Sequence, residues 1–286
     1  MRFLGTGAAE MLPDPFCDCP LCRDAREHPE HVRLRSMLQL DRDSLIDFGP
    51  DLGAVCARYR LDLTGLRQVF VTHTHQDHFC FANAGLVHMS RTRTEPLDIY
   101  LSEGALKSLE AVFLPAQQPN AGMGKAARHV QDHIRFHPVA VGEPFRVGAY
   151  TVTALGTTHP VSEFENAVNY LFRRDDGRKL LYACDTGYYP EGSLAILEGA
   201  QTDVLIMDAT YGSNEDANTR SHLNAWAFRD MLAIFLERKI ITPGTRVFAT
   251  HINHKHTFTH ELYQQWFDQN APIPVTVARD GLEAEW

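Results

Sequence analysis

Residues 72–78 constrain this chain more than any other segment. They read Thr-His-Thr-His-Gln-Asp-His and follow directly on the apolar run 68–71. A strand that ends in such a cluster delivers its polar side chains to one point at the edge of a sheet. Three imidazoles and a carboxylate this close would leave polar atoms unpaired unless a cation held them. The segment therefore indicates a metal site.

Short apolar runs alternate with turn residues and helical patterns along all 286 residues, and 44% of the residues are hydrophobic, which is enough for a sizeable core. We find no repeat or linker, so we expect one α/β domain over 1–286, with mixed sheets and helices outside them. The least regular stretch, 115–137, is predicted to be a surface excursion and a lid candidate.

The predicted elements rest on apolar periodicity and turn residues. The strands are expected at 1–5, 36–40, 44–47, 68–72, 97–101, 150–155, 167–173, 179–183, 204–208, 247–250 and 275–277. The helices are expected at 19–27, 51–59, 104–112, 193–197, 222–237 and 260–269.

Charge and cysteine content restrict the class of protein. The net charge is −9 and no block is rich in Lys or Arg, which argues against a broad nucleic-acid surface. No apolar run reaches transmembrane length, and the first residues lead into a strand-like run rather than a signal peptide, so no membrane partner is expected. Three of the six cysteines crowd into 17–22 and three are scattered, a poor disulfide framework that favours a reducing cytoplasm.

Three further apolar runs end near ligand-type side chains. His159 follows the run 150–155, Asp185 follows 179–183, and His251 follows 247–250. Each of these residues alone could be an ordinary turn residue. Together with the segment 72–78 they indicate a metal site built along one edge of the sheets.

On these residues the chain resembles the metallo-β-lactamase-fold hydrolases, from Leu4-Gly5-Thr6-Gly7 to the last strand. The resemblance implies an αββα sandwich with a dinuclear metal site. Asp47, in Leu45-Ile46-Asp47-Phe48-Gly49, matches the family's Asp-x-Gly strand end and would support the ligand loop. The implied ligands are His73, His75 and His159 for one ion, Asp77, His78 and His251 for the other, and Asp185 as a bridge between them.

Two positions separate this chain from sister groups of that family. Residue 76 is Gln, where redox di-iron members carry Glu, so oxygen reduction is not expected. Residue 185 is Asp, where many true β-lactamases carry Cys. A bridging carboxylate suits two closely coupled ions such as Zn²⁺ or Mn²⁺.

The cysteine triplet Cys17, Cys19 and Cys22 forms a Cys-x-Cys-x-x-Cys motif in a proline-rich loop. Three thiolates with a fourth ligand make a closed, structural zinc site. The triplet is similar to that of the phosphoribosyl cyclic phosphate phosphodiesterase (PhnP-like) subgroup, and this similarity implies His254 as the fourth ligand. The same subgroup has a histidine that opens a helix after a polar loop, which here is His222, and the resemblance implies that it lies near the leaving group.

These features imply a metal-dependent hydrolase, with phosphodiester hydrolysis by a metal-bridging hydroxide and with His222 as general acid. The expected partner is a small phosphate ester, either cyclic or open, and homodimer formation stays open. A thioester, lactone or lactam hydrolase on the same two ions is an alternative. A third reading is a non-hydrolytic biosynthetic protein like PqqB, which has a related cysteine triplet but a degraded histidine motif. Arg33 and Arg35 are either strand-edge surface residues or contacts for a substrate phosphate.

Overall fold

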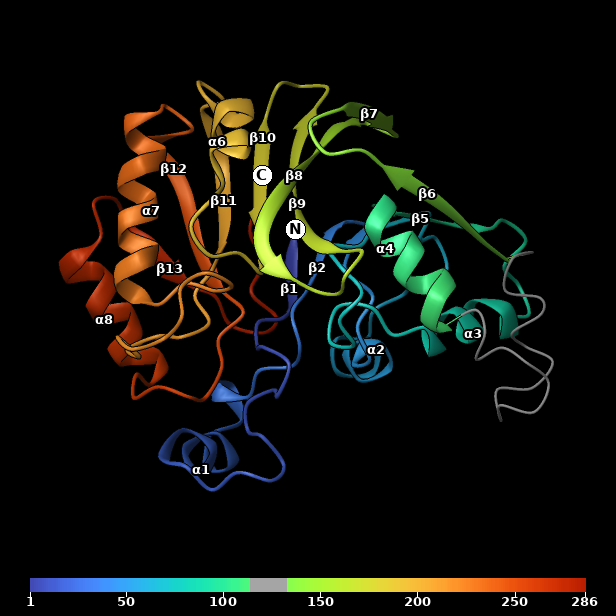
Figure 1. Ribbon diagram of the computed structural model, residues 1–286. Helices are drawn as coiled ribbons and strands as arrows, with labels where there is room; N and C mark the ends of the chain where they lie inside the picture. Colours follow the sequence, from blue (N-terminus) through green and yellow to red (C-terminus); the bar gives the residue numbers. More distant parts are fainter. Residues whose placement is uncertain (114–132) are drawn as a thin grey trace.

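A computed structural model describes residues 1–113 and 133–286 and shows two stacked sheets with helices on both outer faces (Figure 1). In the first sheet the strands follow the order β1-β2-β3-β4-β5-β6. The pairs β1–β2 and β2–β3 are antiparallel, and the pairs from β3 to β6 are parallel. The strands are β1 (Arg2–Gly5), β2 (Met37–Asp41), β3 (Ser44–Ile46), β4 (Gln68–Phe70), β5 (Leu97–Ser102) and β6 (Ile134–Val139).

The second sheet has the order β13-β12-β11-β10-β9-β8-β7. The pairs among β10, β11, β12 and β13 are parallel, so the carboxyl ends of these strands lie at the same edge. The pairs among β7, β8, β9 and β10 are antiparallel. The strands are β7 (Pro144–Val147), β8 (Tyr150–Pro160), β9 (Asn166–Arg174), β10 (Lys179–Ala183), β11 (Thr202–Asp208), β12 (Ile241–Thr250) and β13 (Val275–Val277).

Helices cover the outer face of each sheet, and this arrangement confirms the predicted αββα sandwich (Figure 1). Three helices begin where a polar side chain accepts a hydrogen bond from the first turn: Ser102 caps α4, Asn224 caps α7 and Thr259 caps α8. The helices on the first sheet are α2 (Leu52–Tyr59), α3 (Ala82–Met89) and α4 (Glu103–Ser108), which continues as a π-helix (Leu109–Phe113). Those on the second sheet are α6 (Glu191–Leu197), α7 (Ala225–Glu237) and α8 (His260–Asn270), while α1 (Pro20–Glu27) and the 3₁₀ turn Pro29–His31 lie beyond the sandwich.

Aromatic side chains join the two sheets. The rings of Phe70 and Phe172 meet edge-on with centroids 5.0 Å apart, and those of Phe3 and Phe248 lie 5.3 Å apart. All four side chains are buried. Truncating such a ring to alanine costs about 3–5 kcal/mol, so these contacts fix the spacing of the sheets and the edge where the site lies.

Three residues leave their strands with a positive φ. Asp47 after β3, Asp185 after β10 and His251 after β12 have φ of 67°, 55° and 61°. Non-glycine residues rarely take this conformation, which costs of order 1–3 kcal/mol and persists only where surrounding contacts hold it. At all three positions the turn places a ligand-type or supporting side chain at the shared edge of the sheets.

The structure differs from the sequence-based prediction in several elements. Strand β8 runs on to Pro160, so His159 lies in the strand and not in a loop after it, and β12 begins at Ile241. Helix α7 begins at Ala225, three residues after the predicted start, because Asn224 is its cap. The prediction also missed α3, β6 and β7.

The predicted surface excursion at 115–137 lies mostly outside the described residues. For 134–137 the prediction is wrong, because these residues belong to strand β6. No helix within 1–113 and 133–286 is long and apolar enough to cross a membrane.

Candidate metal centre

His73, His75 and His159 form the first group of candidate ligands. Nε2 of His73 lies 3.0 Å from Nδ1 of His75, and Nε2 of His159 lies 3.2 Å from the same atom. His73 and His75 follow β4 in the first sheet, whereas His159 comes from β8 in the second. The stacking of the two sheets therefore completes this group.

Asp77, His78, His251 and Asp185 form the second group. Nε2 of His78 lies 3.2 Å from a carboxylate oxygen of Asp77, 3.0 Å from one of Asp185 and 3.3 Å from Nε2 of His251. Ligand atoms of His73, His78 and Asp185 also cluster together, which places Asp185 between the two groups. Asp185 thus contacts residues of both groups, and its role as a bridge between two ions stays a prediction.

Three of the ligand rings are held by their other nitrogen. Nδ1 of His78 donates to Asp47 at 2.7 Å, and Nδ1 of His251 lies 2.8 Å from the hydroxyl of Thr210. Nδ1 of His159 donates to the carbonyl of Ser221 at 3.1 Å. Such outer contacts orient imidazoles for a metal, so the support expected from Asp47 is present in the structure.

Burial lowers the pKa of His73 well below its usual value and also lowers the pKa of His75 and His159. Neutral imidazoles are the form that binds a metal. Burial alone would raise the pKa of Asp185, yet the imidazoles of His251 and His78 hold it well below its usual range. The first group thus offers neutral nitrogen donors beside the ionised carboxylate of Asp185. Burial opposes a charge on His78 as well, but Asp185 and Asp77 outweigh it and raise the pKa of His78 well above its usual value, so a cation would displace a proton from that ring. This donor set fits borderline divalent cations such as Zn²⁺ and Mn²⁺.

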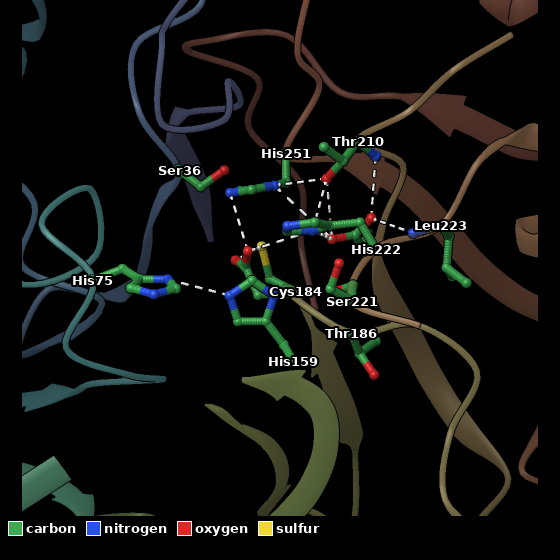
Figure 2. Close-up of polar contacts among 12 residues, drawn as sticks. Ser36, His75, His159, Cys184, Thr186, Thr210, Ser221, His222, Leu223 and His251 are labelled. Atoms are coloured by element: carbon green, nitrogen blue, oxygen red, sulfur yellow. Dashed lines mark hydrogen bonds and ion pairs between the residues drawn. The ribbon is translucent and has the colours of Figure 1, made fainter. Parts of the chain in front are cut away.

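His222 lies beside Asp185 without belonging to the predicted ligand set. Its Nδ1 donates to Asp208 at 2.8 Å, lies 3.2 Å from the Thr210 hydroxyl and is 3.6 Å from Asp185 (Figure 2). Burial opposes a charge on this ring, but Asp208 outweighs it and raises the pKa of His222 to about 9 when no cation is present. The structure also groups Asp208, Asp185, His222 and His251.

The sequence analysis missed Asp208. This residue ends strand β11, just as Asp185 and His251 come directly after strands β10 and β12. Its second oxygen accepts the backbone N–H groups of Leu223 and Thr210 (Figure 2 shows the contact with Leu223). These bonds fix the loop that carries His222. The signal in the sequence was weak, namely an aspartate directly after the apolar run 204–207.

The thiolate group lies apart from these residues, beside α1. The sulfur and nitrogen atoms of Cys17, Cys19, Cys22 and His254 gather within 4.8 Å of one another. Sγ of Cys19 lies 3.6 Å from Nδ1 of His254, and none of these cysteines is in a disulfide. Asp14, which the sequence analysis missed, lies 3.3 Å from Nε2 of His254, close enough for an ion pair with a charged ring but without a hydrogen bond to it. Three sulfurs and one imidazole fit a tetrahedral zinc ion.

The fold and these donor groups define a metallo-β-lactamase-fold protein. The sequence profile of the β-lactamase superfamily domain matches residues 42–252, and the chain belongs to this superfamily. A relative, the coenzyme PQQ synthesis protein B of Methylobacterium radiotolerans, is 26% identical to this chain. The alignment, 315 positions long with its gaps, covers 98% of this chain and 97% of the relative.

Two solved structures show the same fold over almost the whole chain. A diphosphatase of the PhnP family has a TM-score of 0.72 and 22% identity, covering 99% of this chain and 96% of that chain. Zinc-bound PqqB of Methylobacterium extorquens has a TM-score of 0.71 and 18% identity, covering 100% of this chain and 99% of that chain. At these identities the similarity concerns the fold.

Proposed function

We propose that this protein is a metal-dependent phosphodiesterase that acts on a small organic phosphate ester. The observation that carries the proposal is the placement of His222, which is held by Asp208 against Asp185 at the junction of the two ligand groups. A hydrolase that expels a poor leaving group gains a factor of about 10²–10⁴ from such an acid beside its metal ligands, whereas a protein that only binds metal gains nothing from it.

Seven side chains would hold two divalent cations, with Asp185 shared between them. Bound there, the ions would supply a water of lowered pKa and positive charge for a phosphoryl group. His75 is half-buried, and the other six ligands and Asp208 are buried, so the chain's own residues would keep most bulk water from this position. The ligands are His73, His75, Asp77, His78, His159, Asp185 and His251.

His222 would protonate the oxygen of the departing alcohol. Its Nδ1 is engaged by Asp208 and Thr210, which leaves Nε2 to donate a proton to a substrate atom. Asp208 would keep the ring in this tautomer and stabilise its charged form. The thiolate group would hold a zinc ion with a structural role, because its four donors leave no open position.

The comparisons support a second candidate function. The relative from Methylobacterium radiotolerans matches from end to end and is named for coenzyme PQQ synthesis. A biosynthetic role of that kind, without hydrolytic turnover, is the alternative to a phosphodiesterase. A thioester, lactone or lactam hydrolase would use the same residues.

Turnover assays on the purified protein with Mn²⁺ or Zn²⁺ separate these functions. We expect hydrolysis of bis(p-nitrophenyl) phosphate in preference to nitrocefin and a thioester, and loss of it on adding a chelator. On an alkyl phosphodiester, whose leaving group needs a proton, His222→Ala should lose turnover, and His137→Ala, which changes a half-exposed histidine on β6, is the matched control. Faster turnover of nitrocefin or the thioester would favour those substrates. No turnover of any of them by metal-loaded protein would favour the biosynthetic role.

A further inference from the structure

A cavity of about 520 Å³ opens directly beside Asp77. Small-molecule pockets in proteins usually have about 300–1,000 Å³. The cavity is lined by loops of the first sheet: Ala9 follows β1, Arg35 precedes β2, Pro50 follows β3, and residues 76–82 follow β4. Because Asp77 belongs to the second ligand group, a molecule in this cavity would lie against the candidate metal centre.

We propose that this cavity binds the organic group that stays on the phosphorus when a phosphodiester is hydrolysed, and that this group is a flat apolar ring with a hydrogen-bond acceptor. The inference rests on the proposed phosphodiesterase function and names the substrate class within it.

The walls of the cavity are apolar. Phe79 and Phe81 line it and are 1% and 7% exposed, and Ala9 and Pro50 add further apolar surface. Gly49, next to Pro50, packs closely on the loop that carries Asp77, because a Cβ at Gly49 would lie 2.3 Å from the carbonyl oxygen of Asp77. A ring placed between these walls would be removed from water at the site where its phosphate meets the ligands.

Arg35 supplies a directed donor to the cavity. Its Nε donates to the carbonyl of Ala9 at 2.8 Å, and its Nη1 donates to both oxygens of Asp51 at 3.0 and 3.2 Å. Among the described residues nothing accepts from Nη2, so one nitrogen of a fixed guanidinium is left for a ligand. Asp51 offsets much of the positive charge, so Nη2 suits a neutral carbonyl or ether oxygen better than a second phosphate.

Arg33, the other candidate phosphate contact, has a different role. It is 4% exposed and donates to the hydroxyl of Thr6 at 2.7 Å and to the carbonyl of Ala278 at 2.6 Å. These bonds tie β1 to the C-terminal region, so Arg33 is structural and Arg35 is the arginine that can meet a substrate.

The position of His222 assigns the two ends of the substrate. His222 belongs to a loop that precedes α7 on the second sheet, whereas the cavity is built only by loops of the first sheet. The leaving alcohol would lie toward His222, and the group that stays on the phosphorus would lie toward Arg35. A larger cavity of about 950 Å³, beside Arg67, Pro96 and Arg135, lies at the amino ends of β4, β5 and β6 and contains none of the candidate ligands.

Three esters with one leaving group test the proposal on metal-loaded protein: the methyl, phenyl and 4-acetylphenyl esters of p-nitrophenyl phosphate. We expect kcat/KM for the phenyl ester to exceed that for the methyl ester by at least about 10-fold, as for a filled apolar pocket. The 4-acetylphenyl ester should be better still, and Arg35→Met should remove only this last gain. Ala82→Phe, which fills the cavity, should bring the phenyl-to-methyl ratio toward one. Leu86→Phe, on the same helix outside the cavity, should keep it.

Alkylation of Cys80 gives a readout that is independent of turnover, because this thiol lines the cavity. We expect diphenyl phosphate to slow its modification by iodoacetamide several-fold, and dimethyl phosphate at the same concentration to leave the rate unchanged. Equal kcat/KM for the three esters would overturn the cavity assignment while leaving the phosphodiesterase intact. If no ester were hydrolysed, the proposed function would fail, and Cys80 protection would decide on the cavity alone, with equal rates for both phosphates counting against it.

Discussion

Glu165 accepts two hydrogen bonds from Thr74, one from the backbone N–H at 2.8 Å and one from the side-chain hydroxyl. Thr74 lies between His73 and His75, and Glu165 lies in the turn between β8 and β9, six positions after His159. The carboxylate is 2% exposed. The contact joins the ligand loop of the first sheet to the β8–β9 hairpin of the second sheet. It therefore helps to position His73 and His75 relative to His159.

Removal of this carboxylate should weaken metal binding by the first ligand group more than it lowers the stability of the fold. We expect Glu165→Ala to lose metal from the His73 group during dialysis against a weak chelator, because Thr74 is no longer held, and Glu165→Gln to retain it, since the amide oxygen still accepts. Metal content by elemental analysis and the melting temperature give the two readouts. Glu163→Ala, in the same turn but exposed, is the control. Unchanged metal content in Glu165→Ala would exclude this positioning role.

The thiolate group should contribute to stability and not to turnover. Cys19→Ser should lower both zinc content and melting temperature, because the binding energy of such a site is folding energy. Asp14→Ala should have a smaller effect of the same sign, since it removes the carboxylate that lies 3.3 Å from Nε2 of His254. Cys56→Ser, on α2 away from the group, is the matched control. Full zinc content and an unchanged melting temperature in Cys19→Ser would contradict the assignment.

His260 should make the fold sensitive to acid. Nη2 of Arg33 donates to Nδ1 of His260 at 3.0 Å, which requires a neutral imidazole. Burial, followed by the charges of Arg33 and Arg279, lowers the pKa of His260 to about 3. In the unfolded chain the group has its ordinary pKa of about 6.5, so the unfolded state binds more protons and stability falls as the pH drops below about 6.5.

His260→Gln keeps an acceptor for Arg33 but cannot be protonated. The free energy of unfolding by urea, measured between about pH 7 and about pH 5, should therefore fall less steeply in this variant than in the native chain. Release of metal at low pH affects both proteins alike, so the difference between them reports His260. Parallel slopes would show that His260 does not titrate differently in the two states.

His222→Ala should lose turnover in proportion to how much the leaving group needs a proton. A general acid contributes a factor of about 10²–10⁴, so the loss should be large for an alkyl ester and small for a p-nitrophenyl ester. Steady-state rates for a series of leaving groups measure this slope, with metal content as the control. Equal losses across the series would indicate that His222 positions the substrate instead.

The sequence predicted the parts of the site that are local. Residues 72–78, and the candidate ligands that follow β10 and β12, stand beside apolar runs that are easy to recognise, and the structure brings them together. The prediction failed where tertiary contacts decide. Asp208 looks like any strand-end residue until His222 is placed beside it, and Glu165 has no local pattern at all because its partner, Thr74, is far away in the chain.

The element boundaries show the same limit. β6 and β7 were missed because each is short and contains a proline, Pro138 in β6 and Pro144 in β7, which argues against a strand, and because pairing with β5 and β8 is what forms them. The start of α7 was placed at His222, since a polar loop before an apolar run resembles a helix start, whereas Asn224 makes the capping bond. Both His222 and Asn224 could have started this helix. The backbone N–H of Leu223 donates to Asp208, so the residues before Asn224 stay outside the helix.

Metal content per chain tests the central claim, namely that the chain holds a two-ion centre and a separate zinc. Protein purified without chelator should contain two ions at the His/Asp groups and one zinc at the thiolates. Asp185→Ala should lose the pair and keep the zinc, because it removes the residue shared by both groups, while Cys19→Ser should lose the zinc and keep the pair. Native protein with a single ion, or an Asp185→Ala variant with undiminished metal content, would contradict the account.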